Sequence, residues 1–449
     1  MYKYVSINEK IKSFKKNIEV DSDKSLTIRS ILIASQAIGI SKIANLLKSE
    51  DVINALKVIK KLGINYKFKS NILEINGYGI NGFNVKKNTI INAGNSGTLA
   101  RLILGLLIKT NQKIKLIGDK SLSKRDFLRV SKPLSLFGAN IKLKKNSLPL
   151  EIEGTKFLRP IDYIENKGSA QCKSAVMLAA LNTPGITKIK AKKSRNHTEI
   201  FFKQLNIPIK VKSNNKYDFI EVKGLNQFKS FNYKIPGDIS SSAFFIVLTL
   251  LSNKSEIVIR RININKSRIG IIKILNKMNA KIRYKNKKIY KGEETADIYV
   301  KSVKKFKPIK CPSTLNSAAI DEFLVIFLIA AKANGISTFN NLSELNKKES
   351  PRLDIAVKIL KMIGVKVKRY KDNINIHGNP NLNLNGNFHL KNYQKDHRVA
   401  MTAVIAALSF GGNWKIEDLK ESIKTSFPNF LKIVKILGAK INWKITKIL

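Results

Sequence analysis

The sequence is poor in the residues that hold metal ions and form disulfides. It contains 2 cysteines and 4 histidines among 449 residues, and Cys172 and Cys311 stand far apart in apolar or helical surroundings. None of these residues shows the short spacing of a metal-binding motif, and so few cysteines are typical of a reducing compartment. We therefore expect neither a metal nor a cofactor.

Long hydrophobic runs are also lacking. One of the longest, FLVIFLIAA from Phe323, is far shorter than the roughly 20 residues that a membrane-spanning helix needs. The N-terminal sequence MYKYVSINEKIKSFKK has no apolar core of the kind found in secretory signals. These two absences predict a cytoplasmic protein without a membrane partner.

Acidic residues are scarce, since 31 Asp and Glu stand against 83 Lys and Arg, which gives a net charge of +52. Such a charge attracts phosphate groups, nucleic acids or anionic membranes. The lysines are spread among Ile and Asn along the whole chain, and no zinc-finger spacing, RNP-type aromatic motif or basic zipper accompanies them. We expect most of the charge to lie on a solvated surface and predict no nucleic-acid partner.

What the sequence does contain is a sixfold repeat of an amphipathic helix, a turn residue and an alternating strand. The six turn residues, which suit a left-handed helix C-terminus, are Gly63, Gly138, Asn206, Asn279, Gly364 and Gly438. Their spacing ranges from 68 residues (Gly138 to Asn206) to 85 residues (Asn279 to Gly364). Each repeat is therefore long enough for one supersecondary unit, and the length of the chain predicts at least two domains.

A second kind of helix, apolar nearly all round, precedes each of these amphipathic helices and is expected to be buried. Its starts are polar: DKSLTIR from Asp23, GNSGTLAR from Gly94, SAQCKS from Ser169, GDISSS from Gly237, AAIDE from Ala318 and DHRVAM from Asp396. Helix N-termini attract anions, so several such starts in one cleft would bind a phosphorylated substrate. For any single start, ordinary helix capping is the simpler explanation.

Ten segments, in order over nearly the whole chain, resemble the motifs of the 5-enolpyruvylshikimate-3-phosphate (EPSP) synthase family. They are DKSLTIR, GNSGTLAR, SLSKRDFLR, SAQCKSA, SRNHTE, PGDISSSAFF, IDE, KKESPR, DHRVAM and KTSFPNF. The segments SAQCK and Arg195 to Glu199 resemble the class called type II.

The resemblance implies an α/β fold: a two-domain inside-out α/β barrel of six βαβαββ units, three in each domain. It places residues 1–22 and 238–449 in one domain and residues 23–237 in the other, with the active site in the cleft between them. The implied reaction transfers the enolpyruvyl group of phosphoenolpyruvate to the 5-hydroxyl of shikimate 3-phosphate and releases phosphate. The implied partners are these two small molecules alone, and we expect a monomer.

The resemblance also implies the site residues. Shikimate 3-phosphate would contact Lys24, Ser25, Arg29, Ser169, Ala170, Gln171, Ser194, Arg195, Asp321 and Lys348. Phosphoenolpyruvate would contact Lys24, Gly97, Arg125, Gln171, Arg352 and Arg398. Arginine suits this second role because its planar fork pairs with carboxylate and phosphate groups.

Three residues would carry the chemistry: Asp321 as proton acceptor, and Glu349 with Lys24 as a proton relay. Two carboxylates and a lysine supply the acid and base that an addition followed by an elimination requires. Taken alone, Asp321 could equally be the N-cap of the helix that follows it.

The chain departs from the family pattern at several positions. The departures are Asp21-Ser22 for Pro-Gly, Asp126 for Pro, Pro351 for Asp, and Thr425 for the cleft lysine of the enterobacterial type, beside Lys424. A negative charge at Asp126 could weaken the neighbouring Arg125, and Pro351 favours an extended Ser350.

Two other functions remain open from the sequence. A sister enolpyruvyl transferase acts on UDP-N-acetylglucosamine, but that family has a loop cysteine, and this chain has none between residues 64 and 171. A basic RNA-binding protein built on the same module would rest on the charge alone.

Overall fold

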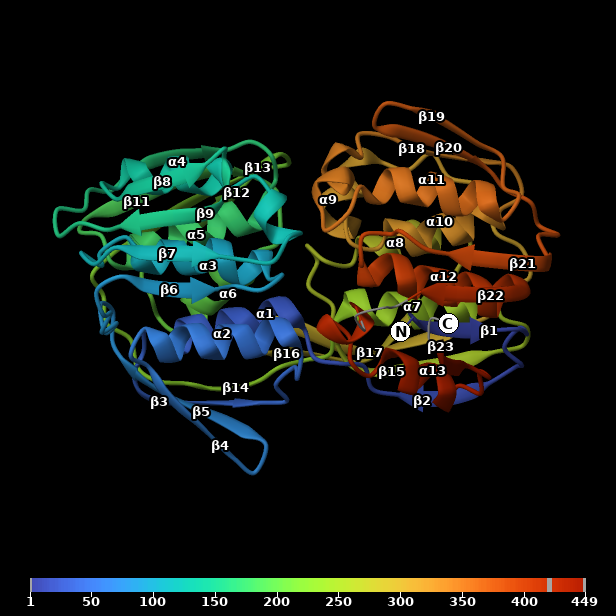
Figure 1. The fold of residues 1–449 in the computed structure, drawn as a ribbon, viewed down its shortest axis with the longest axis horizontal. Coiled ribbons are helices and arrows are strands. Elements are labelled where there is room, and N and C mark those ends of the chain that lie inside the picture. The colour runs from blue at the N-terminus through green and yellow to red at the C-terminus, as the bar shows by residue number, and fades with distance from the viewer. Residues whose placement is uncertain (1, 418–421, 447–449) are drawn as a thin grey trace. The chain divides into compact units, whose positions relative to one another are not determined.

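The chain folds into two compact units in the computed structural model, which describes residues 2–417 and 422–446 (Figure 1). Unit 1 comprises Met1–Asp21, Pro236–Lys288 and Glu294–Leu449, and unit 2 comprises Ser22–Ile235 and Ile289–Glu293. The backbone therefore leaves unit 1 twice, once for a long segment and once for five residues.

Unit 2 contains three four-stranded sheets built on one plan. Their strand orders are β14(Asn232–Lys234)-β3(Ile38–Ala44)-β5(Ile72–Tyr78)-β4(Asn65–Lys69), β6(Thr89–Asn92)-β7(Ile114–Ile117)-β9(Ser147–Glu153)-β8(Asn140–Lys144) and β10(Asp162–Glu165)-β11(Ile186–Lys192)-β13(Tyr217–Lys223)-β12(Ile209–Ser213). In each sheet the first two strands pair in parallel and the others in antiparallel fashion. Every second residue of β5, β9 and β13 is buried, so one face of each sheet packs on the core.

Unit 1 also contains three sheets. Their strand orders are β16(Lys281–Tyr290)-β17(Glu293–Lys301)-β15(Glu256–Asn263)-β2(Lys15–Ile18), β18(Ile336–Phe339)-β20(Asn373–His377)-β19(Val367–Tyr370) and β21(Leu384–Leu390)-β22(Gly411–Glu417)-β1(Tyr2–Ile7)-β23(Asn442–Thr446). Strand β2 precedes unit 2 in the chain and pairs in parallel with β15, which follows it. The strand of that sheet that comes first in the chain, β2, therefore lies before unit 2 in the sequence.

Six helices that are buried nearly all round form the centres of the two units. They are α1(Lys24–Ala34), α3(Gly97–Leu107) and α5(Ala170–Leu181) in unit 2, and α7(Ile239–Leu251), α10(Phe323–Ala331) and α12(His397–Phe410) in unit 1. Small residues allow them to pack closely: a Cβ at Gly105 of α3 would lie 2.1 Å from the carbonyl oxygen of Ala175 in α5. Each unit has its own apolar core around its three helices.

Six further helices carry an apolar face and a solvated face. They are α2(Glu50–Lys61), α4(Leu128–Leu136), α6(His197–Gln204), α8(Gly270–Lys277), α11(Arg352–Met362) and α13(Phe430–Ile436). All six predicted turn residues that follow them have positive φ, between 55° and 113°. The left-handed ends predicted from the sequence are confirmed, as is the α/β fold of six repeats.

The short elements are α9(Asn316–Ala319) and the 3-10 helices η1(Leu122–Lys124), η2(Ser313–Leu315), η3(Ser343–Lys347) and η4(Ser422–Thr425). No helix within the described ranges is long and apolar enough to cross a membrane.

The tip of the β16–β17 hairpin, Ile289–Glu293, is the five-residue piece of unit 2. The hydroxyl of Tyr290 accepts a hydrogen bond from the Lys234 amide at 2.9 Å, and its ring lies 5.7 Å from that of Tyr233. The Glu293 carboxylate lies 2.6 Å from Nδ1 of His197, and both side chains are buried. The tip therefore completes the surroundings of α6, a feature that the sequence did not predict.

Candidate active site

Side chains cap most of the buried helices at the polar starts singled out in the sequence. Asp23, Ser96, Ser169, Asp238 and Asp396 each accept a hydrogen bond from an amide in the first turn of α1, α3, α5, α7 or α12. Capping, the simpler explanation, is thus true of these five residues. Capping by these five residues does not involve the side chains of the cations and amides beside them, which can therefore bind a ligand.

Asp321 is different, because the N-cap of α10 is Glu322 and no side chain caps that helix. The Asp321 carboxylate instead lies 3.3 Å from Nζ of Lys348 and 3.4 Å from Nη1 of Arg352. The capping alternative for Asp321 is therefore wrong, and its carboxylate lies among cations.

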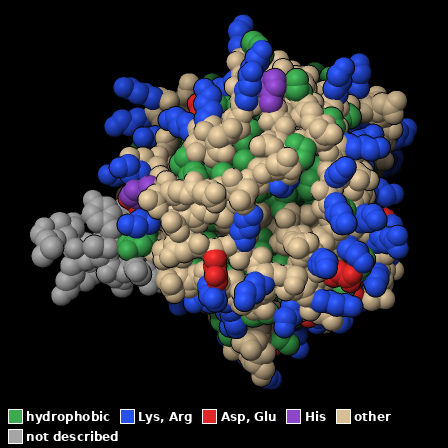
Figure 2. Space-filling view, turned by 90° about the vertical axis from the view of Figure 1, so that its right-hand side faces the viewer, with side chains coloured by type: hydrophobic (Ala, Val, Ile, Leu, Met, Phe, Trp, Pro, Cys, Tyr) green, Lys and Arg blue, Asp and Glu red, His purple; other side chains and the backbone are tan. Residues whose placement is uncertain are grey.

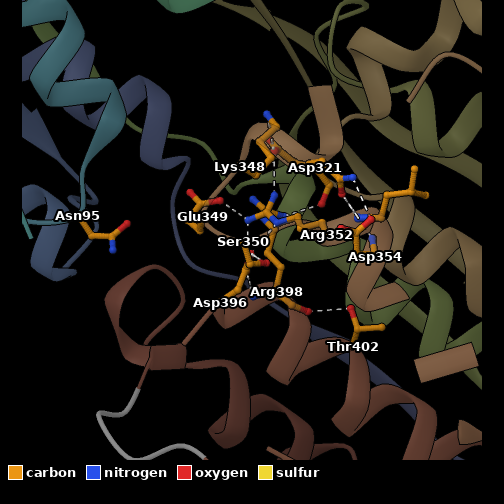
Figure 3. Close-up of polar contacts among 12 residues, drawn as sticks. Asn95, Asp321, Lys348, Glu349, Ser350, Arg352, Asp354, Asp396, Arg398 and Thr402 are labelled. Carbon is orange, nitrogen blue, oxygen red and sulfur yellow. Dashed lines mark hydrogen bonds and ion pairs between the residues drawn. The ribbon is translucent and has the colours of Figure 1, made fainter. Parts of the chain in front are cut away.

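In unit 1, Arg352 lies at the centre of a cluster of carboxylates (Figure 3). Its Nε and Nη2 donate to the two oxygens of Asp396 at 2.8 and 3.2 Å, and Nη2 also donates to Glu349. Although burial disfavours the charged form of Arg352, Asp396, Glu349 and Asp321 outweigh it and raise the pKa of Arg352. The cluster therefore holds a permanent cation beside Glu349 and Asp321.

The remaining predicted residues of unit 1 join this cluster. Arg398 donates from Nη1 to the backbone oxygen of Asp321 at 3.0 Å. The Ser350 hydroxyl donates to Asp396 at 2.8 Å, which ties the segment around Pro351 to the start of α12. All five predicted residues of this unit, Asp321, Lys348, Glu349, Arg352 and Arg398, are brought together.

In unit 2, three motifs meet at Arg29 of α1. Its guanidinium donates to the Thr198 hydroxyl at 3.0 Å, to the Ser174 hydroxyl at 3.2 Å and to the backbone oxygen of Ser25 at 3.1 Å. The hydroxyls of Ser174 and Thr198 lie 2.7 Å apart. The starts of α1, α5 and α6 are therefore held side by side.

A buried ion pair strengthens this junction. Nζ of Lys173 on α5 lies 2.6 Å from the Glu199 carboxylate on α6, and both residues are buried. The pair lies close to the predicted contacts Ser169, Ala170 and Ser194 in the chain. The Ser194 hydroxyl is buried and has no hydrogen-bond partner among the described residues, so it can donate to a ligand.

Lys24 lies at the first position of α1, and its Nζ is 3.0 Å from the carboxylate of Asp51 in α2. The lysine side chain keeps 21% of its surface exposed. Asp51 was not among the predicted site residues, and its one signal in the sequence is an acidic residue in the first turn of α2. Arg195 is half-buried at the end of the loop before α6.

The start of α3 gathers positive charge around Gly97. A Cβ at Gly97 would lie 2.9 Å from Nη1 of Arg125 and 2.9 Å from Nη1 of Arg101. Arg125 also donates to the Asn95 side-chain oxygen at 2.9 Å. A side chain at this position would displace both guanidinium groups, so glycine leaves them close to the backbone.

Asp126 serves the start of the helix that follows it. Its carboxylate accepts a hydrogen bond at 2.8 Å from the amide of Leu128, the first residue of α4. Asp126, which replaces the family proline, therefore supplies a hydrogen-bond acceptor at the start of α4.

Two other departures also have local roles. Asp21 accepts a hydrogen bond from the Asn429 amide at 3.0 Å. The Thr425 hydroxyl donates to the backbone oxygen of Ser422 within η4, while Lys424 is exposed.

Comparison with known proteins gives one consistent result. The family model described as "EPSP synthase (3-phosphoshikimate 1-carboxyvinyltransferase)" matches residues 8–434. A 3-phosphoshikimate 1-carboxyvinyltransferase of Ruthia magnifica subsp. Calyptogena magnifica is 37% identical over 430 residues, which cover 95% of this chain and 96% of that protein. One of Legionella pneumophila (strain Corby) is 36% identical over 438 residues, covering 97% and 98%.

Solved structures agree with these relatives. An EPSP synthase from Acinetobacter baumannii superimposes with a TM-score of 0.86 at 32% identity, over 99% of this chain and 100% of that one. The enolpyruvyl transferase NikO from Streptomyces tendae superimposes with a TM-score of 0.77 at 11% identity, over the same shares, which supports the fold alone.

Proposed function

The chain belongs to the EPSP synthase family, and from this premise we propose that it transfers the enolpyruvyl group of phosphoenolpyruvate to the 5-hydroxyl of shikimate 3-phosphate. The products are 5-enolpyruvylshikimate 3-phosphate and inorganic phosphate, and the step belongs to aromatic amino acid biosynthesis. Asp321 carries the proposal, because its carboxylate is half-buried between Lys348 and Arg352 and is not the N-cap of α10.

In the proposed addition, Asp321 accepts the proton of the 5-hydroxyl while that oxygen attacks C2 of phosphoenolpyruvate. The methylene carbon takes up a proton from the relay of Glu349 and Lys24, which gives a tetrahedral ketal. In the elimination, a proton returns from the new methyl group to the relay and the phosphate leaves with its bonding electron pair. A proton acceptor and a proton donor are both needed, and the two carboxylates with the lysine supply them.

Substrate anions would be held by cations from both units. We assign the phosphoenolpyruvate phosphate and carboxylate to Arg125, Arg352 and Arg398, with Gly97 allowing close approach of the backbone. Arg29, Ser169, Ser194 and Lys348 are assigned, together with the other predicted contacts, to shikimate 3-phosphate. The two units are thus proposed to be the domains whose residues act on one pair of substrates.

No contact within residues 2–417 and 422–446 favours either alternative function. We propose a monomeric cytoplasmic enzyme whose only partners are the two small substrates. On the face that Figure 2 shows, Lys and Arg side chains are separated by uncharged groups, which supports a dispersed charge rather than a single basic binding surface.

Release of inorganic phosphate tests the proposal. The purified protein should release phosphate only when both substrates are present, and Asp321→Ala or Lys24→Met should lower kcat by about 10²- to 10⁴-fold, the range for loss of a general acid or base. Asp162→Ala and Lys12→Met are matched controls on exposed residues and should keep full turnover. Full turnover by the Asp321 and Lys24 variants would show that the assignment of the site is wrong.

A further inference from the structure

Arg101 is a buried cation beside the proposed phosphoenolpyruvate site, and it is not among the residues predicted to contact a substrate. It lies one turn after Gly97 on α3, is 7% exposed, and its guanidinium carbon is 5.1 Å from the centre of the Phe127 ring. No Asp or Glu in the described part of the chain lies within ion-pair distance of it, and its Nε is buried without a hydrogen-bond partner. Burial, together with the charges of Arg125 and Arg129, lowers the pKa of Arg101 to about 10.

The guanidinium fixes the side chain of Gln171 on the neighbouring helix α5. Nη1 of Arg101 donates to Oε1 of Gln171 at 2.7 Å, and Nε2 of Gln171 donates to the Thr98 hydroxyl at 3.0 Å. A guanidinium can only donate, so the amide oxygen must face Arg101. The amide is therefore clamped between two residues of α3, and one of its two N–H hydrogens remains available.

We propose that Arg101 is a positioning residue that turns the N–H side of Gln171, and not its carbonyl oxygen, toward the anionic substrate. An unclamped amide can present either side, and a carbonyl oxygen facing a phosphate or carboxylate would repel it. The uncompensated charge of Arg101, next to Arg125 and Gly97, adds attraction for the same anion. This inference rests on the proposed contact of Gln171 with both substrates.

The test compares steady-state kinetics of four variants in the full-length enzyme. Arg101→Met keeps the length and removes the donors, and it should lower kcat/KM for phosphoenolpyruvate by about 10- to 100-fold, as for loss of a hydrogen bond from a charged group. Gln171→Ala should have a similar effect, and the double variant should be little worse than Gln171→Ala alone. Arg129→Met removes a charge from the same group of arginines. Among the described residues, the Gln171 side chain has hydrogen bonds to Arg101 and Thr98 and none to Arg129, so the expected change is under about threefold.

Two results would overturn the inference: losses in Arg101→Met and Gln171→Ala that multiply in the double variant, or an Arg101→Met enzyme as active as Arg129→Met. If Arg101→Met does not fold, judged by its thermal unfolding, then Gln171→Glu decides. That variant keeps an oxygen for Arg101 but replaces the N–H side by a second oxygen, so a kcat/KM below that of Gln171→Ala supports the inference and a kcat/KM equal to or above it refutes the inference. Failure of the wild-type enzyme to release phosphate would contradict the proposed function instead.

Discussion

Asp396 is fully buried, and it accepts four hydrogen bonds from three residues. It caps α12 through the Arg398 amide at 3.0 Å, accepts the Ser350 hydroxyl, and pairs with Arg352 through both oxygens. Burial alone would raise the pKa of Asp396, but the charge of Arg352 outweighs it and the pKa is lowered. One carboxylate thus positions two of the arginines assigned to phosphoenolpyruvate.

Asp396→Asn tests this residue, because asparagine caps a helix as well as aspartate but carries no charge. Loss of one partner of a buried ion pair should lower the free energy of unfolding of unit 1 by about 3 kcal/mol at pH 7. For a unit of this size that is roughly 6 to 12 °C in the thermal midpoint, measured by calorimetry.

The pH dependence of Asp396→Asn follows from the direction of the shift. A lowered pKa in the folded state means that the ionised form stabilises the fold above the unfolded pKa of about 3.9, and that this contribution is lost as the pH falls through the lower, folded value. The difference between wild type and variant should therefore be constant from pH 7 to 5 and shrink below about pH 4. A difference that does not change with pH would contradict the role of the charge.

Among the elements, the contact of α3 with α5 constrains the proposed site, because Thr98 and Gln171 lie on these helices. Gly105→Ala places a Cβ 2.1 Å from the carbonyl oxygen of Ala175, and a backbone atom cannot move aside alone. Alanine favours a helix by about 1 kcal/mol, but we expect the collision to dominate and to lower the stability of unit 2 by about 1 to 3 kcal/mol.

Thermal unfolding checks this prediction, with Gly105→Ser as a larger side chain at the same position. The serine variant should be less stable than the alanine variant, and both less stable than wild type. An alanine variant as stable as wild type would show that the two helices can separate at no cost.

Elements were predictable from the sequence wherever a local pattern determines them. Asn206 and Gly438 have positive φ, and they end amphipathic helices because a regular helix cannot continue through such a residue. Helices that are apolar all round could be predicted to lie at the centre of a unit, because only there is every face buried. Contacts such as Lys24 with Asp51, or Arg101 with Gln171, could not be predicted in this way. They join residues 27 and 70 positions apart, and packing of whole helices decides them.

The whole molecule carries far more positive charge than its proposed chemistry uses. Seven Lys and Arg residues serve the proposed site, whereas the chain has 83, and on the face that Figure 2 shows the Lys and Arg side chains are dispersed among uncharged groups. Dispersed charge binds any polyanion weakly and without specificity.

We therefore expect weak retention on double-stranded DNA or RNA at about 50 mM salt, falling by orders of magnitude by about 200 mM. Fluorescence anisotropy with unrelated sequences of equal length measures this, and light scattering at the higher salt should give the 50.5 kDa of a monomer. A complex with one RNA that persists at 200 mM salt would contradict the proposal.

The tip of the β16–β17 hairpin has a consequence for recombination between related genes. A gene segment that encodes 22–235 would exchange most of unit 2 between relatives, but it would leave behind Glu293, the acid partner of buried His197, and Tyr290, the neighbour of Tyr233. The unit is encoded in two pieces that are separated by a stretch belonging to the other unit. Recombination that moves only the long piece would combine it with a hairpin tip from another protein. We therefore expect substitutions in the two pieces to be correlated between relatives.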